Sequence, residues 1–204
     1  MRKQLHIIST GKQSKEELIE RAISVQPYID YLHLREKSWQ AMDVVEVIEA
    51  LNEKGFPKEK IIVNDRVDVA QVTGIHQVQL AYHSLHIRAV RTHFPKLRIS
   101  ASVHSVEEAI EKEQLGAEKV IFGHVFETLS KQNVPPRGLD TLTKLVSAIN
   151  IPVIAIGGIS PDKVHSVLHT GAEGLAVLSG VLLADNPVDA AKRFREKLDS
   201  WKGG

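Results

Sequence analysis

The chain has 204 residues, of which 43% are hydrophobic and 25% are charged, and its formal net charge is +1. This balance is ordinary for a globular protein and gives no sign of nucleic acid or an acidic membrane surface as the main partner. The absence of cysteine excludes disulfides, thiolate nucleophiles and cysteine–zinc sites, and it fits a reducing compartment. The N-terminal segment lacks the apolar stretch of a signal peptide, and no apolar run approaches the roughly 20 residues that span a bilayer. We therefore expect a cytoplasmic protein.

Eight short segments rich in β-branched residues are predicted as strands. In chain order they span residues 4–9, 29–36, 60–65, 76–81, 97–104, 118–123, 152–158 and 173–179. Amphipathic patterns between these segments predict helices over residues 14–25, 41–55, 105–116, 160–171 and 187–201. Ser14 and Ser105 are expected to cap two of these helices, because each is followed three residues later by a glutamate. Ser160 is expected to cap a third, with Pro161 in its first turn.

Strands that alternate with helices predict parallel βα units with right-handed crossovers. Eight such units in a chain of this length are typical of a closed (β/α)₈ TIM barrel, an α/β fold, here expected as one domain over residues 1–204. The alternative is an open doubly wound sheet, in which a glycine-rich phosphate loop follows the first strand. The corresponding stretch IISTGKQS contains a single glycine, which favours the barrel.

Polar residues gather at the C-terminal ends of the predicted strands, where barrel enzymes carry their chemistry. They include His33, Arg35, Glu36, Lys37, Asn64, Asp65, Arg66, Ser102, His104 and His124. The loops after the last two strands are predicted to bind a phosphate, because their small residues let the backbone approach an anion closely. The predicted phosphate-binding residues are Gly157, Gly158, Ser179 and Gly180.

Six segments along nearly the whole chain resemble, in order, the thiamin phosphate synthase family. They are YLHLREK, VNDRVDVA, SVH, FGHVFETLSK, PVIAIGGIS and GLAVLSG. Synthases of this family are (β/α)₈ barrels that join a pyrimidine pyrophosphate to a thiazole phosphate using Mg²⁺. The resemblance implies that Arg35 and Lys37 lie in the pyrophosphate-binding stretch and that residues 128–131 lie in the thiazole-phosphate loop. Together with the strand ends, it predicts as substrate-binding residues Arg35, Lys37, Asn64, Ser102, Thr128, Ser130 and Lys131.

The chain departs from the synthase pattern after the fourth predicted strand. The family reads roughly Gly-Val-His-Leu-Gly-Gln-Glu-Asp-Leu, whereas this chain reads QVQLAYHSL. Aligned on Leu85, the position of the metal-binding aspartate is Ser84. Mg²⁺ prefers carboxylate oxygens together with substrate phosphates, so Asp65 without this partner is a weak ligand set. We therefore expect no metal ion and no cofactor.

A second departure follows the sixth predicted strand. Synthases carry Gly-Pro-Ile-Phe-Pro-Thr, whereas this chain has GHVFET, with His124 in place of the proline. The stretch FGHVFET resembles the TenI-type thiazole tautomerases of the same family. It predicts an isomerase that aromatises the thiazole phosphate carboxylate, with His124 as the general acid and base and with no metal. Two alternatives stay open: a thiamin phosphate synthase and a non-catalytic regulatory barrel. We expect no nucleic acid or membrane partner, and a homodimer is the commonest assembly for such a protein.

Overall fold

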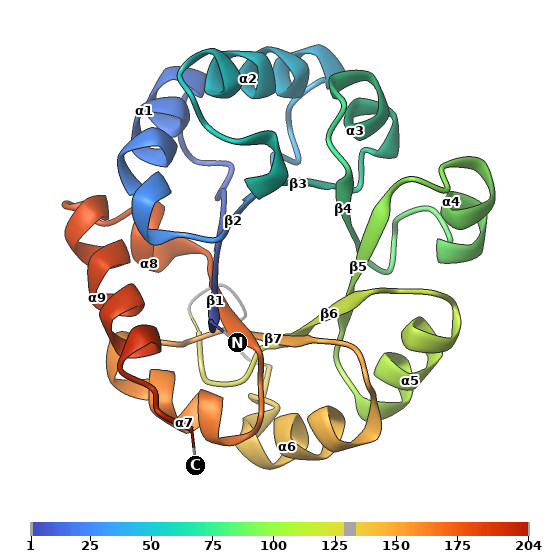
Figure 1. Ribbon diagram of the computed structural model, residues 1–204, viewed down its shortest axis with the longest axis vertical. Coiled ribbons are helices and arrows are strands. Elements are labelled where there is room, and N and C mark those ends of the chain that lie inside the picture. The colour runs from blue at the N-terminus through green and yellow to red at the C-terminus, as the bar shows by residue number, and fades with distance from the viewer. Residues whose placement is uncertain (1, 129–133, 204) are drawn as a thin grey trace.

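The computed structural model describes residues 2–128 and 134–203. Eight parallel strands form a closed barrel in which each strand pairs with the next and β8 pairs with β1 (Figure 1). The strands are β1 (Gln4–Ile8), β2 (Tyr31–Leu34), β3 (Ile61–Asn64), β4 (Gln77–Leu80), β5 (Arg98–Val103), β6 (Lys119–Gly123), β7 (Val153–Ile156) and β8 (Gly174–Val177). Each lies within its predicted segment and is shorter than predicted at one or both ends. The predicted (β/α)₈ barrel is confirmed.

The helices surround the barrel, and most of them connect consecutive strands (Figure 1). They are α1 (Lys15–Val25), α2 (Ala41–Glu53), α3 (Val67–Thr73), α4 (Ile87–His93), α5 (Val106–Gln114), α6 (Gly138–Ala148), α7 (Val164–His169), α8 (Ser179–Leu182) and α9 (Pro187–Asp199). The sequence did not predict α3, α4 or α6. The first two are too short to show a period of 3.6 residues in an 11-residue window, whereas the spacing of Leu139, Leu142, Leu145 and Val146 does indicate α6.

The predicted helix over residues 160–171 is two elements, a 3₁₀ turn at Pro161–Lys163 followed by α7. Of the three predicted serine caps, those at Ser14 and Ser105 are present, whereas the side chain of Ser160 makes no capping hydrogen bond. The hydroxyl of Ser14 accepts a hydrogen bond from the backbone N–H of Glu17, and that of Ser105 accepts one from Glu108, each at 3.1 Å. Within the part of the chain that the structure describes, no helix has the length and apolar character needed to cross a membrane.

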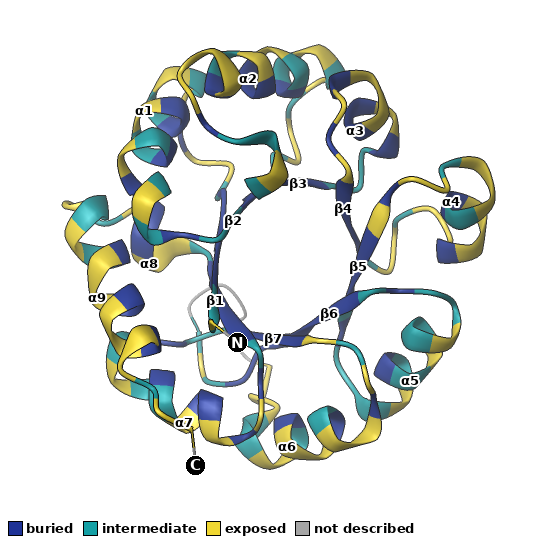
Figure 2. Ribbon diagram, viewed as in Figure 1, coloured by how far each residue is buried: buried dark blue, intermediate teal, exposed yellow. Residues whose placement is uncertain are grey.

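The apolar core has two separate parts, because successive side chains of a strand point to opposite faces. Leu5 and Ile7 of β1 belong to the larger part, which fills the space between the strands and the buried faces of the helices (Figure 2). Ile8 belongs to the smaller part inside the barrel, where it packs with residues of β6, β7 and β8. This inner cluster consists of Ile8, Ile121, Ile154 and Ala176.

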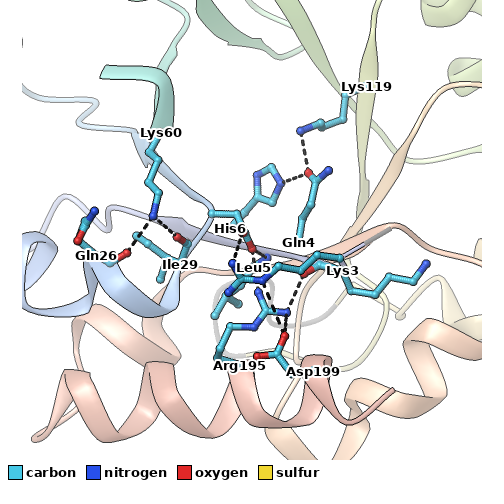
Figure 3. Close-up of polar contacts among 12 residues, drawn as sticks. Lys3, Gln4, Leu5, His6, Gln26, Ile29, Lys60, Lys119, Arg195 and Asp199 are labelled. Carbon is cyan, nitrogen blue, oxygen red and sulfur yellow. Dashed lines mark hydrogen bonds and ion pairs between the residues drawn. The ribbon is translucent and has the colours of Figure 1, made fainter. Parts of the chain in front are cut away.

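Below the inner apolar cluster, toward the N-terminal ends of the strands, the barrel interior is polar. His6 and His33 are fully buried, and the Nδ1 atom of His6 lies 2.8 Å from the Nε2 atom of His33. The carbonyl oxygen of the Gln4 side chain lies 3.0 Å from the other ring nitrogen of His6 and accepts a hydrogen bond from the Lys119 ammonium at 2.9 Å (Figure 3). The same ammonium lies 4.3 Å from the centre of the Tyr31 ring. This hydrogen-bonded chain provides partners for the polar side chains that fill this end of the barrel.

Burial favours the neutral forms of the ionisable side chains inside the barrel, which are His6, His33 and Lys119. The pKa of His33 is lowered to about 3, first by burial and then by the positive charge of Lys119. Burial and the neighbouring His33 and Lys119 lower the pKa of His6 as well. The pKa of Lys119 is lowered to about 8, mainly by burial. Both histidines are therefore neutral parts of the core.

Candidate active site

A cavity of about 480 Å³ opens at the C-terminal ends of the strands. Ile8, Ile121 and Ala176 of the inner apolar cluster line it, so that cluster forms its floor. Most of the predicted site residues meet here, from the ends of β2, β3, β5, β6, β7 and β8. Those that line the cavity are Arg35, Lys37, Asn64, Ser102, His124, Thr128, Gly157, Gly158, Ser179 and Gly180. Ser130 and Lys131 lie outside the described residues, and the roles assigned to all these side chains stay predictions.

His124 follows β6 directly and is almost completely buried at the cavity wall. Its Nε2 atom lies 3.0 Å from the backbone oxygen of Val134. Since a carbonyl oxygen only accepts hydrogen bonds, Nε2 carries a proton and the neutral ring has its lone pair on Nδ1. That buried Nδ1 atom has no hydrogen-bond partner among the described residues. Because this atom is inaccessible to solvent, the side chain lines the cavity through its other atoms.

Gly157 and Gly158 are required by the packing of the loops after β6 and β7. Both have left-handed backbones, with φ of 105° and 64°. A Cβ atom on Gly157 would clash with the Cβ of His124, and one on Gly158 would clash with the backbone oxygen of Glu127. The sequence explains these glycines by anion binding or by the ends of the strands that precede them. The contact between the two loops is a further reason for them, and it becomes visible only in the folded barrel.

The remaining cavity walls come from the ends of β1 and β3 and from β2, β4, β5 and β8 with the loops that follow them. The backbone N–H of Arg35 donates to the hydroxyl of Ser9 at 2.8 Å, which ties the β2 loop to the end of β1. Gln79 also lines the cavity and donates to Ser102 at 2.9 Å. Gln79 was not predicted as a site residue, although its alternation with Val78 and Leu80 in β4 indicates a side chain that points into the barrel. The short helix α8 begins at Ser179.

Glu36 does not contribute to the cavity wall. Its carboxylate accepts a hydrogen bond from the backbone N–H of Gly11 at 3.3 Å, on the neighbouring β1 loop. Burial raises the pKa of this carboxyl group above its ordinary value. Glu36 therefore connects two loops and is not among the side chains that can reach a ligand in the cavity.

Asp65, at the end of β3, is bound to two side chains of the β4 loop. The hydroxyl of Ser84 donates to its Oδ1 atom, and the Nε2 atom of His83 lies 2.9 Å from its Oδ2 atom. Both oxygens of the carboxylate thus have partners within the protein. Among the described residues, no group of three or more histidine or acidic side chains is placed to hold a metal ion. This set of donors does not fit Mg²⁺, which prefers an octahedron of oxygen ligands that includes one or two carboxylates.

Comparison with known proteins shows the family. Residues 5–181 match the family model described as thiamine monophosphate synthase. A thiamine-phosphate synthase of Pyrococcus furiosus is 33% identical over 98% of this chain and 96% of its own length, and one of Chlorobium luteolum is 32% identical over 98% and 95%. The solved structure of a thiamine phosphate pyrophosphorylase from Pyrococcus furiosus superposes with a TM-score of 0.86 at 32% identity, covering 98% of this chain and 97% of that one.

These relatives contradict the predicted thiazole tautomerase. The prediction gave two departures from the synthase pattern, Ser84 for aspartate and His124 for proline, more weight than the rest of the chain. Similarity to the synthases extends over almost the full length, including the strand ends that line the cavity. The synthase alternative is therefore the better supported of the sequence-based interpretations. The chain belongs to the thiamine monophosphate synthase family.

Proposed function

We propose that the protein is a transferase that joins a pyrimidine pyrophosphate to a thiazole phosphate and releases pyrophosphate. The observation that carries this proposal is that one cavity brings together two groups of predicted anion-binding residues. Arg35 and Lys37 come from the β2 loop, and the predicted phosphate-binding residues come from the β7 and β8 loops. The cavity volume of about 480 Å³ lies within the range of roughly 300–1,000 Å³ typical of small-molecule sites.

The proposed reaction exchanges one bond for another. The C–O bond between the pyrimidine methylene carbon and the pyrophosphate breaks, and its electron pair leaves with the pyrophosphate. The lone pair of the thiazole nitrogen forms the new C–N bond to the same carbon. The protein has to bind both rings in line and to stabilise the negative charge that develops on the leaving oxygen.

The cationic side chains of Arg35 and Lys37 are suited to the leaving pyrophosphate, because charge-assisted hydrogen bonds to phosphate are among the strongest in proteins. The backbone N–H groups around Gly157 and Gly158, with Ser179 and Gly180, are suited to the thiazole phosphate. Holding both reactants in one cavity turns an encounter of two molecules into a step within one complex.

Other predicted residues would position the rings. Asn64 and Ser102 offer neutral hydrogen-bonding groups, and His124 lines the cavity with them. Thr128 lines the cavity, while Ser130 and Lys131 stay predictions for the thiazole phosphate. A homodimer also stays a prediction.

A direct assay tests the proposal. Purified protein is incubated with the pyrimidine pyrophosphate and the thiazole phosphate, once with Mg²⁺ and once with EDTA, and thiamine phosphate is measured by mass spectrometry. We expect thiamine phosphate and pyrophosphate to form in equal amounts, and only when both substrates are present. Protein that binds both substrates but forms no thiamine phosphate in either buffer would contradict the proposed function.

A further inference from the structure

The rim between β3 and β4 is built around an unusual backbone position. Asp65 has φ of 61°, and among the described residues it is the only non-glycine residue in the left-handed region. Its backbone N–H donates to the carbonyl oxygen of Gln79 at 3.0 Å. Aspartate tolerates this conformation better than most residues, but still at a cost, so such positions persist where surrounding contacts hold them.

Ser84 supplies one of these contacts. Its hydroxyl accepts a hydrogen bond from the backbone N–H of Ala81 at 2.6 Å and donates its own proton to the Asp65 carboxylate. The backbone N–H of Ser84 in turn donates to the carbonyl oxygen of Ala81 at 3.1 Å. The β4 loop thus closes into a tight turn whose hydroxyl is aimed at Asp65.

His83 supplies the second contact and reaches the cavity. Its Nε2 atom lies 2.9 Å from the Asp65 carboxylate, and its side chain is 47% exposed. The ring also lines the active-site cavity. With Nε2–H given to the carboxylate, the remaining ring nitrogen is the one available to a ligand. A ring oriented in this way by the carboxylate can form a hydrogen bond with a phosphate group in the cavity.

The charges around this rim favour an anion. Arg35 and Lys37 line the cavity from the β2 loop, on the other side of β3 from His83. Arg66 is turned away, because its guanidinium pairs with Asp68. His104, from the β5 loop, lies beside Glu108 with its Nδ1 atom 3.4 Å from that carboxylate. The Asp65 carboxylate is therefore the acidic group next to His83, and its two oxygens are already bonded.

The sequence of the β4 loop also differs from the family pattern in a way that favours an anion at this rim. Where the pattern has consecutive glutamate and aspartate, this chain has His83 and Ser84. Two negative side chains that would need a divalent cation to face a pyrophosphate are replaced by an imidazole and a hydroxyl. At these two positions the rim therefore carries hydrogen-bonding groups in place of carboxylates.

We propose that Asp65, Ser84 and His83 form a clasp that stands in place of a divalent metal at this rim, and that His83 contacts the pyrophosphate group of the substrate. The identity of the anion rests on the proposed function. The clasp itself rests on the hydrogen bonds of the three side chains and on their position at the cavity.

Binding of inorganic pyrophosphate, measured by isothermal titration calorimetry, tests the clasp without any turnover. In EDTA the wild-type protein should bind pyrophosphate, and added Mg²⁺ should not tighten the binding. His83→Gln should weaken binding about tenfold or more, and Asp65→Asn should weaken it by a smaller factor because the ring loses its orienting charge. His93→Gln, at an exposed position on α4 away from the cavity, should bind as the wild type does.

A gain of metal dependence provides the converse test. The double variant with His83→Glu and Ser84→Asp restores the two acidic side chains of the family pattern, so its pyrophosphate binding should require Mg²⁺. Wild-type binding that requires Mg²⁺, or His83→Gln binding that equals that of the wild type, would overturn the clasp. Neither of these results bears on the coupling assay. If the coupling assay fails while pyrophosphate binding depends on His83, only the proposed function is overturned.

Discussion

The Nδ1 atom of His6 lies 2.8 Å from the Nε2 atom of His33, inside the barrel and below the active-site cavity. One ring donates and the other accepts, so the pair needs at least one neutral ring to make this hydrogen bond. Both side chains are fully buried. The hydrogen bonds continue from His6 to the side chain of Gln4 and from there to Lys119. The ammonium of Lys119 is the charged group that faces them, and it adds to the cost of placing a proton on either ring.

Stability should therefore fall in mild acid. The unfolded chain takes up protons on these histidines below about pH 6.5, whereas folded His33 does not until about pH 3. Acid thus favours the unfolded state between about pH 6.5 and about pH 3. Above about pH 6.5, the contribution of His33 to the free energy of unfolding no longer changes with pH. Between pH 7 and pH 5, one such histidine removes about 2 kcal/mol from the free energy of unfolding.

Urea denaturation at the two pH values measures this loss. His33→Gln should be less stable at pH 7 but should lose less further stability at pH 5 than the wild type does. The exposed control His93→Gln should keep the full pH dependence. Identical losses in His33→Gln and in the wild type would show that the interior pair does not carry the effect.

Gly157→Ala should destabilise the protein more than a left-handed backbone alone explains. Gly55 is a matched control, because its φ is 84° and an added Cβ would meet nothing within 4 Å. We expect Gly55→Ala to cost about 1–2 kcal/mol for the backbone conformation. Gly157→Ala should cost about 2 kcal/mol more, since its Cβ would clash with His124. Urea denaturation of both variants checks the difference, and equal losses would mean that the two loops can separate without cost.

Ser179→Asp should weaken binding of the thiazole phosphate, because it places a negative charge beside the predicted phosphate position. Ser179 is exposed, so solvent screens part of the repulsion and we expect a loss of about tenfold. Ser179→Asn has nearly the same shape without the charge and should change affinity less than about threefold. Calorimetric titration with the thiazole phosphate measures both values. Equal affinities for the two variants would place the phosphate elsewhere in the cavity.

Arg35→Met should impair the use of the pyrimidine pyrophosphate. The substitution keeps an unbranched apolar side chain but removes the guanidinium from the cavity wall. If Arg35 stabilises the leaving group, kcat/KM should fall about 100-fold, with a decrease in kcat as well as a rise in KM. Steady-state kinetics with saturating thiazole phosphate separate the two parameters. Arg88→Met, at an exposed position on α4, should be unaffected, and a purely KM-based loss in Arg35→Met would restrict Arg35 to substrate binding.

Much of the barrel could be predicted from short segments of the chain. Runs such as KIIVND and PVIAIGG are strands because β-branched residues favour extended backbone, and parallel strands place their C-terminal ends at one face. That rule alone correctly brings Arg35, Asn64 and Gly158 to one cavity. The choice between synthase and tautomerase was wrong because it depended on two positions, Ser84 and His124, whose chemical roles a sequence does not specify.

Contacts between segments far apart in the chain were decided only by the closed barrel. His6 meets His33 because β1 pairs with β2, and Asp65 meets His83 because the ends of β3 and β4 are neighbours. Gly157 lies against His124 for the same reason at β6 and β7. The sequence by itself determined which residues form strands and which strand ends carry polar groups, since these depend on local backbone preference and alternation. Which side chain binds which other side chain depends on strand register and loop conformation, and these exist only once the barrel has closed.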